Sequence, residues 1–102
     1  MKRIKFNKFA LSELIEAARF YEKEKAELGK DFLKRVRKAL DHIRRYPDSG
    51  TILDSNIRRH TVRRFHHSVI YSNEINNIYI ISIMHQHRHP DHWKSRLKDI
   101  TE

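Results

Sequence analysis

The sequence of 102 residues contains no cysteine and only two glycines, two prolines and one tryptophan. The lack of cysteine excludes disulfide bonds and thiolate chemistry, and it is compatible with a reducing compartment. So few glycines and prolines exclude a flexible linker and a glycine-rich loop that would hold a nucleotide phosphate. No apolar run approaches the roughly 18 residues of a transmembrane helix, and the basic N-terminus lacks the apolar stretch of a signal peptide. We therefore expect a single domain over residues 1–102, without cofactor and located in the cytoplasm.

Acidic residues are scarce relative to basic ones, so the chain carries a strong positive charge. Twenty-two Lys and Arg residues stand against 13 Asp and Glu residues, and the net charge is +9 at pH 7 with histidine neutral. The eight histidines add further charge as the pH falls toward about 6. This balance predicts an anionic partner, such as an acidic protein segment or a nucleic acid.

The spacing of hydrophobic residues predicts an α+β fold, in which a helical hairpin packs on one face of a mostly antiparallel sheet. The element order is β-α-α-β-β-β-(α). The expected elements are a strand at 2–6, helices at 8–28 and 30–46, strands at 57–65, 68–73 and 77–87, and a short helix at 91–99.

Three local features support this assignment. The first helix has an apolar stripe from Leu11 to Tyr21, and Asn7 precedes it as a capping residue. Gly29 is expected to follow the end of this helix in the left-handed conformation that glycine favours. The run 78–84 is nearly all apolar, so we expect the last strand to be covered on both faces.

Four segments carry a recognisable pattern: Ala10–Glu22, Gly29–Leu33, Arg64–Tyr71 and Ile83–Trp93. The last segment contains His85, Arg88, Pro90 and Trp93 at the spacing His-x-x-Arg-x-Pro-x-x-Trp. In this order the segments resemble the RelE/ParE toxins of bacterial type II toxin–antitoxin systems, and the ending is typical of the ParE branch. The resemblance extends from Phe6 to Arg96, and the expected element order agrees with the fold of that family.

The resemblance implies one of two activities. ParE-like members inhibit DNA gyrase and stabilise its cleaved DNA complex, whereas RelE-like members cleave mRNA on the ribosome without metal or cofactor. Both kinds are neutralised by an acidic or amphipathic segment of a cognate antitoxin, and neither requires a membrane or a small-molecule substrate. We expect the ParE-like activity, which is not enzymatic. A module that binds the antitoxin without being toxic is a third interpretation.

Two departures from the mRNA-cleaving branch favour the gyrase interpretation. Ser68 stands where that branch usually carries an arginine, and no tyrosine follows Tyr79 to act as its terminal catalytic residue. The chemistry of RNA cleavage nevertheless has candidates in this chain, since it needs an acid, a base and a cation beside the phosphate. His85 and His87 are candidates for acid and base, and Arg88 and Arg63 for phosphate contacts.

Basic and aromatic residues of the second helix, the following strand and the C-terminal motif are the candidates for binding a target or partner. Trp93 has two interpretations: an exposed aromatic that enters a partner, or a side chain that packs the C-terminal segment onto the sheet with Leu97. Arg88 either contacts the target or forms an ion pair with Asp91 or Glu102. The candidates are Arg37, Lys38, Arg59, Arg63, Arg88 and Trp93.

The histidines near the end of the last strand also suggest a metal site. Zinc uses histidine, but usually together with cysteine or carboxylate ligands. This chain has no cysteine, and Asp91 is the only carboxylate near the cluster. We therefore predict a polar strand end and no metal at His85, His87, His89 and His92.

Overall fold

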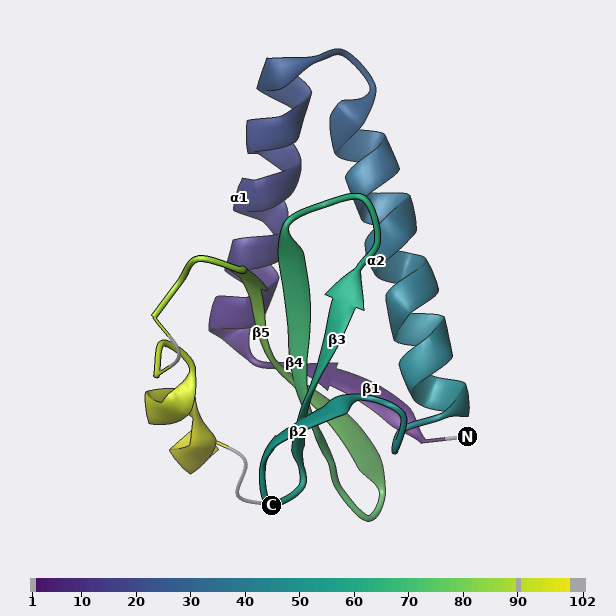
Figure 1. Cartoon of the computed structure of the whole chain (residues 1–102), viewed down its shortest axis with the longest axis vertical. Helices are drawn as coiled ribbons and strands as arrows, with labels where there is room; N and C mark the ends of the chain where they lie inside the picture. Colours follow the sequence, from purple (N-terminus) through teal and green to yellow (C-terminus); the bar gives the residue numbers. More distant parts are fainter. Residues whose placement is uncertain (1, 90, 100–102) are drawn as a thin grey trace.

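The computed structural model describes residues 2–89 and 91–99, which contain two long helices and five strands (Figure 1). In chain order the elements are β1 (Arg3–Phe6), α1 (Lys8–Glu24), α2 (Leu28–Arg45), β2 (Thr51–Asp54), β3 (Ile57–Val62), β4 (His67–Asn73), β5 (Asn77–His85) and the 3₁₀ helix η1 (Lys94–Asp99). None of the described helices is long and apolar enough to cross a membrane.

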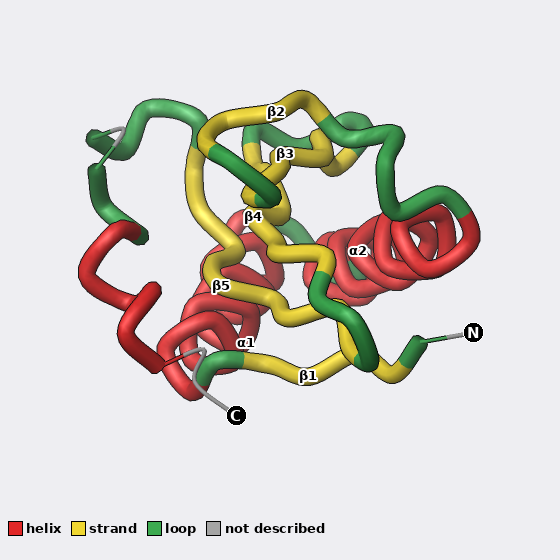
Figure 2. Tube along the Cα trace, turned by 90° about the horizontal axis from the view of Figure 1, so that it is seen from below, coloured by secondary structure: helices red, strands yellow, loops and turns green. Residues whose placement is uncertain are grey.

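The strands form one sheet with the order β1-β5-β4-β3-β2. β1 runs parallel to β5, and every other neighbouring pair is antiparallel, which confirms the mostly antiparallel sheet. With the helices seen end-on, α1 and α2 lie together on one side of the sheet (Figure 2). The C-terminal segment lies near β5 and α1, on the side of α1 that faces away from α2 (Figure 2). The α+β fold with a helical hairpin on one face is therefore confirmed.

Two apolar cores hold these layers together. The larger core lies between the hairpin and the sheet and includes Phe32, Ile43 and Ile80. The smaller core lies on the opposite face, where Trp93 packs with Ile81 and other sheet residues under the C-terminal segment. β5 contributes side chains to both cores, so the prediction that it is covered on both faces is confirmed.

Outside the helical hairpin, the structure differs most from the expected elements at three places. The sequence pattern did not predict β2, because all four of its residues are exposed and it pairs with β3 alone at the edge of the sheet. β3 ends at Val62, and the following residues form a turn in which Arg64 has a φ of 71°. The C-terminal helix is a 3₁₀ helix that begins only at Lys94.

Gly29 is inside α2, so the expectation that it follows the end of the first helix was wrong. The left-handed residue of the interhelical turn is Glu27, with a φ of 74°. Gly29 instead allows close packing of the two helices, since a Cβ at this position would lie 2.6 Å from the carbonyl oxygen of Ala18. The Glu22 carboxylate accepts the N–H groups of Glu27 and Gly29, both at 3.0 Å, and so caps α2 from the preceding helix.

Four rings pack together near the end of the hairpin where the interhelical turn joins α1 to α2. Tyr21, Phe32, Phe65 and His67 have neighbouring ring centroids 4.8 to 5.7 Å apart. His67 is buried, and its Nδ1 lies 3.1 Å from the Tyr21 hydroxyl. Burial disfavours the charged imidazolium, and the neighbouring His85 adds to this effect, so the pKa of His67 is lowered to about 4.

We predict that Gly29→Ala lowers the free energy of unfolding by about 1–3 kcal/mol, because the helices must separate to admit the methyl group. The same exchange in an unobstructed helix stabilises by roughly 0.5–1 kcal/mol, so the sign is diagnostic. Urea denaturation measures the effect, and the pair Lys30→Ala and Lys30→Gly reports the intrinsic difference at an exposed neighbour. A Gly29→Ala protein as stable as the wild type would contradict the close packing.

We predict that His67 makes the fold sensitive to mild acid. Its pKa falls from the ordinary 6.5 to about 4 on folding, so the unfolded chain binds a proton that the folded chain does not. The contribution is present above pH 6.5 and is lost as the pH falls through about 4, which lowers the free energy of unfolding by about 3 kcal/mol.

Denaturant titrations at about pH 7 and about pH 4.5 measure this slope. His67→Phe should remove most of it while keeping the ring contacts. His89→Phe, in which the exchanged side chain is 76% exposed, should retain it. Equal slopes for wild type and His67→Phe would overturn the assignment.

Candidate functional site

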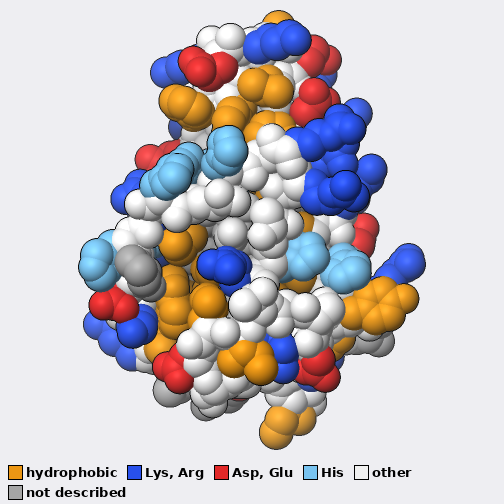
Figure 3. Space-filling view, viewed as in Figure 1, with side chains coloured by type: hydrophobic (Ala, Val, Ile, Leu, Met, Phe, Trp, Pro, Cys, Tyr) orange, Lys and Arg blue, Asp and Glu red, His pale blue; other side chains and the backbone are white. Residues whose placement is uncertain are grey.

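Three of the residues predicted to bind a target converge on the open face of the sheet. Arg59 from β3, Arg88 from the segment after β5, and Trp93 line one cavity of about 240 Å³. Ile70 and Met84 also line this cavity and belong to the smaller core or pack against it, so the cavity lies on the face away from the hairpin. Figure 3 shows hydrophobic side chains gathered on this face with basic side chains among them. We call this cavity and its rim the open-face site.

Trp93 forms part of the inner wall of the open-face site. Its side chain is only 3% exposed, and it packs with Ile57, Ile70 and Ile81. Leu97 packs against the same cluster. Of the two interpretations of Trp93, the structure therefore supports the one in which it packs the C-terminal segment onto the sheet.

Arg88 lies between the open-face site and a second cavity. This second cavity, of about 340 Å³, is also lined by Tyr21, His67 and His85. Asp91 forms its close ion pair with Lys94, at 2.8 Å, and none with Arg88 within the described chain. Glu102, the other carboxylate considered for Arg88, lies outside the described residues. The Arg88 guanidinium is exposed and available to a ligand on this face.

Four histidines gather beside Arg88 at the start of β4 and the end of β5. The rings of His85 and His87 are 5.0 Å apart, and His66 and His67 lie 6.3 and 5.3 Å from His85. Desolvation and the neighbouring positive groups lower the pKa of His85, which keeps the ring neutral and able to accept a proton at pH 7.

The nuclease candidates are brought together only in part. His85, His87 and Arg88 lie in one region, but Arg63 does not belong to it. Arg63 lines a different cavity, between α2 and β3, together with Arg35 and Lys38.

The histidines considered for metal binding separate into three settings. The rings of His85 and His87 lie against each other at an interplanar angle of 36°. His89 lies 4.0 Å from Asp91, whereas His92 contacts the Glu13 carboxylate at 2.7 Å. Within the residues that the structure describes, no three histidine or carboxylate groups converge as metal ligands.

The most extensive polar network is centred on Glu13 of α1. Its Oε1 accepts from the Ser82 hydroxyl at 2.9 Å and the Ile83 N–H at 3.1 Å. Arg96 donates to both carboxylate oxygens, at 2.7 and 3.1 Å, and also to the Ile81 carbonyl at 3.0 Å. Burial alone raises the pKa of Glu13, but the hydrogen bonds from Arg96, His92 and Ser82 outweigh it and leave this pKa below its ordinary value.

This network anchors the C-terminal segment and thereby places Trp93 and the wall of the open-face site. The sequence pattern did not predict this network. Glu13 and Arg96 are 83 positions apart, so no local spacing links them. Glu13 lies off the apolar stripe that the sequence predicts, so nothing in that pattern marked it as a half-buried residue.

A second surface lies between α2 and the end of β3. Two cavities of about 470 Å³ each adjoin there, since Arg35 and Lys38 line both. We call the two together the basic trough; its cations are Lys34, Arg35, Lys38, Arg63 and Arg64. Figure 3 shows Lys and Arg side chains gathered over α2 on this side of the molecule.

The trough contains two of the predicted partner-binding residues and excludes a third. Lys38 and Arg63 line it, but Arg37 does not. Successive residues of a helix point about 100° apart, so Arg37 is exposed on another side of α2 from Lys38. The six candidates therefore fall into the open-face site, the basic trough and an isolated Arg37.

Comparison with known proteins assigns the chain to a family. Residues 4–90 match the family model described as ParE toxin of type II toxin–antitoxin system, parDE. The fold is similar to a solved structure titled "Chromosomal ParDE TA system from P. aeruginosa", with a TM-score of 0.60 and 16% sequence identity over 83% of this chain and 96% of that chain. A search of curated proteins gave no match. Because the family model covers most of the chain, the protein belongs to the ParE toxin family and is the toxin component of a type II toxin–antitoxin system with a cognate antitoxin.

Proposed function

We propose that this toxin inhibits DNA gyrase by binding it and stabilising its cleaved DNA complex. The observation that carries the proposal is the match of residues 4–90 to the ParE family model, which includes both helices and the whole sheet. The proposal makes the protein a binding inhibitor and not an enzyme. It also implies that the toxin acts in the cytoplasm, where the chromosome and gyrase are located.

The open-face site is the surface that we assign to the target. Arg59 and Arg88 place two guanidinium groups around an apolar floor formed by Ile70, Met84 and Trp93. An apolar centre with a charged rim is typical of protein interfaces, and arginine is enriched among the residues that dominate binding energy. The hairpin covers the other face of the sheet, so this face is the one that the fold leaves accessible.

Trapping requires only a difference in affinity between two states of gyrase. A ligand that binds the cleaved state more tightly than the resealed state shifts the population toward the cleaved state, and no bond in the ligand is made or broken. A rigid surface serves this purpose well, because it does not adapt to both states. The Glu13 network and the buried Trp93 supply that rigidity next to Arg88.

We predict that the wild-type protein abolishes supercoiling by purified gyrase and causes cleaved DNA to accumulate. The double variant Arg59→Glu, Arg88→Glu should need at least about tenfold more protein for the same inhibition, because both guanidinium contacts become repulsive. Supercoiling and linear DNA are both scored on gels across a titration of the toxin.

The matched control is Lys23→Glu, Lys25→Glu, which makes the same change in charge at exposed residues at the C-terminal end of α1, outside the open-face site. It should inhibit like the wild type. Full gyrase activity at large excess of wild-type toxin would refute the proposed function. If the wild type and the Arg59→Glu, Arg88→Glu variant inhibit gyrase equally well, only the assignment of the open-face site to the target is refuted. Normal growth of cells that express the chain would favour the non-toxic module.

Ribosome-dependent mRNA cleavage is the second candidate, and the grouping of His85 and His87 beside Arg88 is the observation that favours it. A neutral His85 has the proton affinity of a general base, and Arg88 has the charge to hold a phosphate. Ser68 argues against it, since its side chain is buried between neighbouring strands where RNA cannot reach it.

If the toxin is a nuclease, His85→Ala should reduce mRNA cleavage on purified ribosomes by at least about 100-fold, as expected for loss of a general base. His89→Ala is the control, because that ring is exposed and outside the histidine cluster. Primer extension on a translated message detects cleavage. Equal cleavage by wild type and His85→Ala would remove His85 from the mechanism, and no cleavage by the wild type would remove the function.

A further inference from the structure

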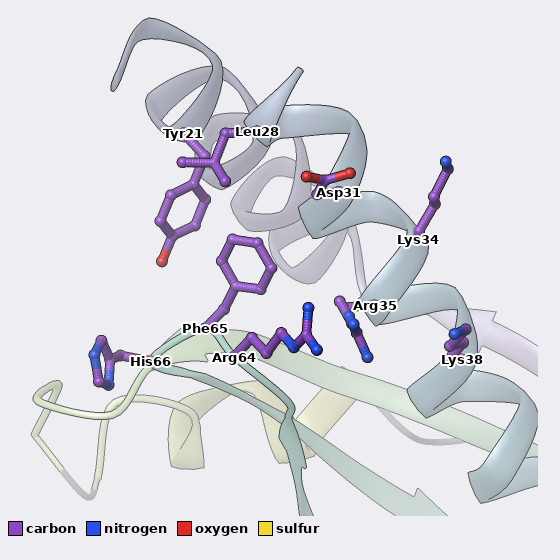
Figure 4. Close-up of a pocket in the computed structure, with 9 residues that line it drawn as sticks. All are labelled: Tyr21, Leu28, Asp31, Lys34, Arg35, Lys38, Arg64, Phe65 and His66. Carbon is purple, nitrogen blue, oxygen red and sulfur yellow. The ribbon is translucent and has the colours of Figure 1, made fainter. Parts of the chain in front are cut away.

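The basic trough contains cations that the folded chain leaves unpaired. Arg35 is half-buried there, yet its guanidinium takes part in no ion pair or side-chain hydrogen bond within the described residues. Arg64, from the β3–β4 turn, points toward Arg35 across the groove and is likewise without a partner in that part of the chain (Figure 4). Like charges held this close repel, so they attract an anion. Guanidinium groups bind phosphate oxygens through paired N–H donors, which makes a phosphate the best match.

The backbone of Arg64 supports the same conclusion. Its φ of 71° is in the left-handed region, which a residue with a side chain rarely adopts outside special sites. β3 has already ended at Val62, so strand geometry does not require this conformation. The strained turn presents the guanidinium to the groove, and such strain concentrates at binding and active sites.

The end of the trough next to Leu28 has a different chemistry. Phe65 and the ring of Tyr21 lie there with Leu28 (Figure 4), and Asp31 is the only carboxylate among the described residues that line the trough. Asp31 is one turn before Arg35 in α2, but no ion pair joins the two side chains within the described chain. A carboxylate repels phosphate and accepts N–H donors. This end therefore suits an uncharged, flat group with donors on its edge.

Phe65 offers a platform for such a group. It is half-buried and packs edge-to-face with Tyr21 and Phe32, at centroid distances of 4.8 and 5.1 Å, so its ring is held in place. It also lines a cavity of about 470 Å³, a volume within the range of cavities that bind small molecules. Nucleobases stack on aromatic rings of this kind.

The second cavity of the trough continues the row of cations. It shares Arg35 and Lys38 with the first cavity and adds Arg63 and two histidines, His42 and His60, whose rings are 5.0 Å apart. None of its described lining residues is Phe, Tyr or Trp. A nucleic-acid strand carries a base beside every phosphate and would find such a platform at one end only. The surface therefore matches one base followed by several linked phosphates.

We propose that the basic trough binds a guanosine oligophosphate, with the base on Phe65 and the phosphates between Arg35 and Arg64 and onward to Lys38. Guanine is the base that we assign, because its ring N–H and its amino group are adjacent donors that one carboxylate accepts, whereas adenine presents an acceptor beside its amino group.

The proposed nucleotide is a ligand and not a substrate. Guanidinium and ammonium groups hold its phosphates directly, so the site does not require the glycine-rich loop that the sequence lacks. The site is also distinct from the open-face site, because the two have no lining residue in common.

Isothermal titration calorimetry of the whole chain with GTP, ATP, GMP and inorganic tripolyphosphate tests the proposal. GTP should bind most tightly. ATP should bind at least about fivefold more weakly, because the Asp31 carboxylate meets one donor in place of two. GMP should bind at least about tenfold more weakly, because it lacks the phosphates that extend past Arg35 and Arg64. Tripolyphosphate should bind more weakly than GTP, because it makes no contact with Phe65.

Two variants separate the two ends of the site. Arg35→Glu, Arg64→Glu should weaken the binding of both GTP and tripolyphosphate at least about tenfold, because two attractive contacts become repulsive. Asp31→Asn should reduce the preference for GTP over ATP to less than about twofold. The same variant should bind tripolyphosphate at least as tightly as the wild type, since a repelling charge is lost.

Lys23→Glu, Lys25→Glu makes the same change in net charge as the arginine variant, at exposed residues outside the trough, and should bind GTP like the wild type. Circular dichroism melts verify that each variant is folded.

Three results would overturn the proposal. No binding of GTP to the wild type, or equal GTP affinity for the arginine variant and the Lys23→Glu, Lys25→Glu control, would exclude the trough as a nucleotide site. Equal affinities of the wild type for GTP, ATP and tripolyphosphate would show that no base is recognised. Tighter binding of a single-stranded oligonucleotide than of GTP, lost in Arg35→Glu, Arg64→Glu, would make the trough a nucleic-acid site. Gyrase is absent from these titrations, so their outcome is separate from that of the supercoiling assay.

Discussion

The arrangement of the open face depends on how the chain satisfies the backbone groups along the unpaired part of the β5 edge. β1 pairs with β5 only as far as Ile80, so β5 continues for several residues without a neighbour on that side among the described strands. Exposed edges of this kind carry free N–H and C=O groups, which either pair with another chain or must be satisfied locally. Here the Glu13 carboxylate accepts the Ile83 N–H and the Arg96 guanidinium donates to the Ile81 carbonyl. The Glu13–Arg96 ion pair, which joins α1 to η1, thus satisfies backbone groups of β5 that a further strand would otherwise pair with.

The same ion pair determines which surfaces the toxin can present. By holding η1 against α1, it brings Trp93 over the sheet and gives the open-face site a wall that the strands alone do not provide. Arg88 is in the short connection between this anchored segment and β5, so its position is restricted from both ends. The proposed target surface is therefore rigid where it meets the C-terminal motif. The basic trough, in contrast, is built from α2 and the β3–β4 turn and does not depend on the C-terminal segment.

The elements that the sequence predicted well are those with a periodic apolar pattern, and the failures have identifiable physical causes. α2 and the long strand β5 have such a pattern, because one or both of their faces are buried. In α1 the apolar stripe is offset from the buried face, since Leu11 and Ile15 are exposed whereas Ala10 and Ala17 are buried. β2 lacks it, since all its residues are exposed. Gly29 was assigned to a helix end because glycine favours positive φ, but here its lack of a Cβ serves interhelical packing. The sequence predicted which kinds of residue bind a target. It did not predict that Lys38 and Arg37 lie on different surfaces, or that Arg63 and His85 line different cavities, because this depends on the three-dimensional arrangement.

The uneven distribution of charge connects stability with partner binding. Where the chain has a half-buried carboxylate, as at Glu13, Arg96 and other hydrogen-bond partners surround it and the network is satisfied. In the trough the cations of α2 and the turn repel one another, and Arg64 adopts a strained backbone conformation of the kind that costs of order 1–2 kcal/mol. A ligand that binds only the folded chain stabilises it by an amount that grows with ligand concentration relative to Kd. An anionic group bound in the trough would offset the repulsion between these cations. The network around Glu13 is balanced internally, so it has no such repulsion for a ligand to relieve.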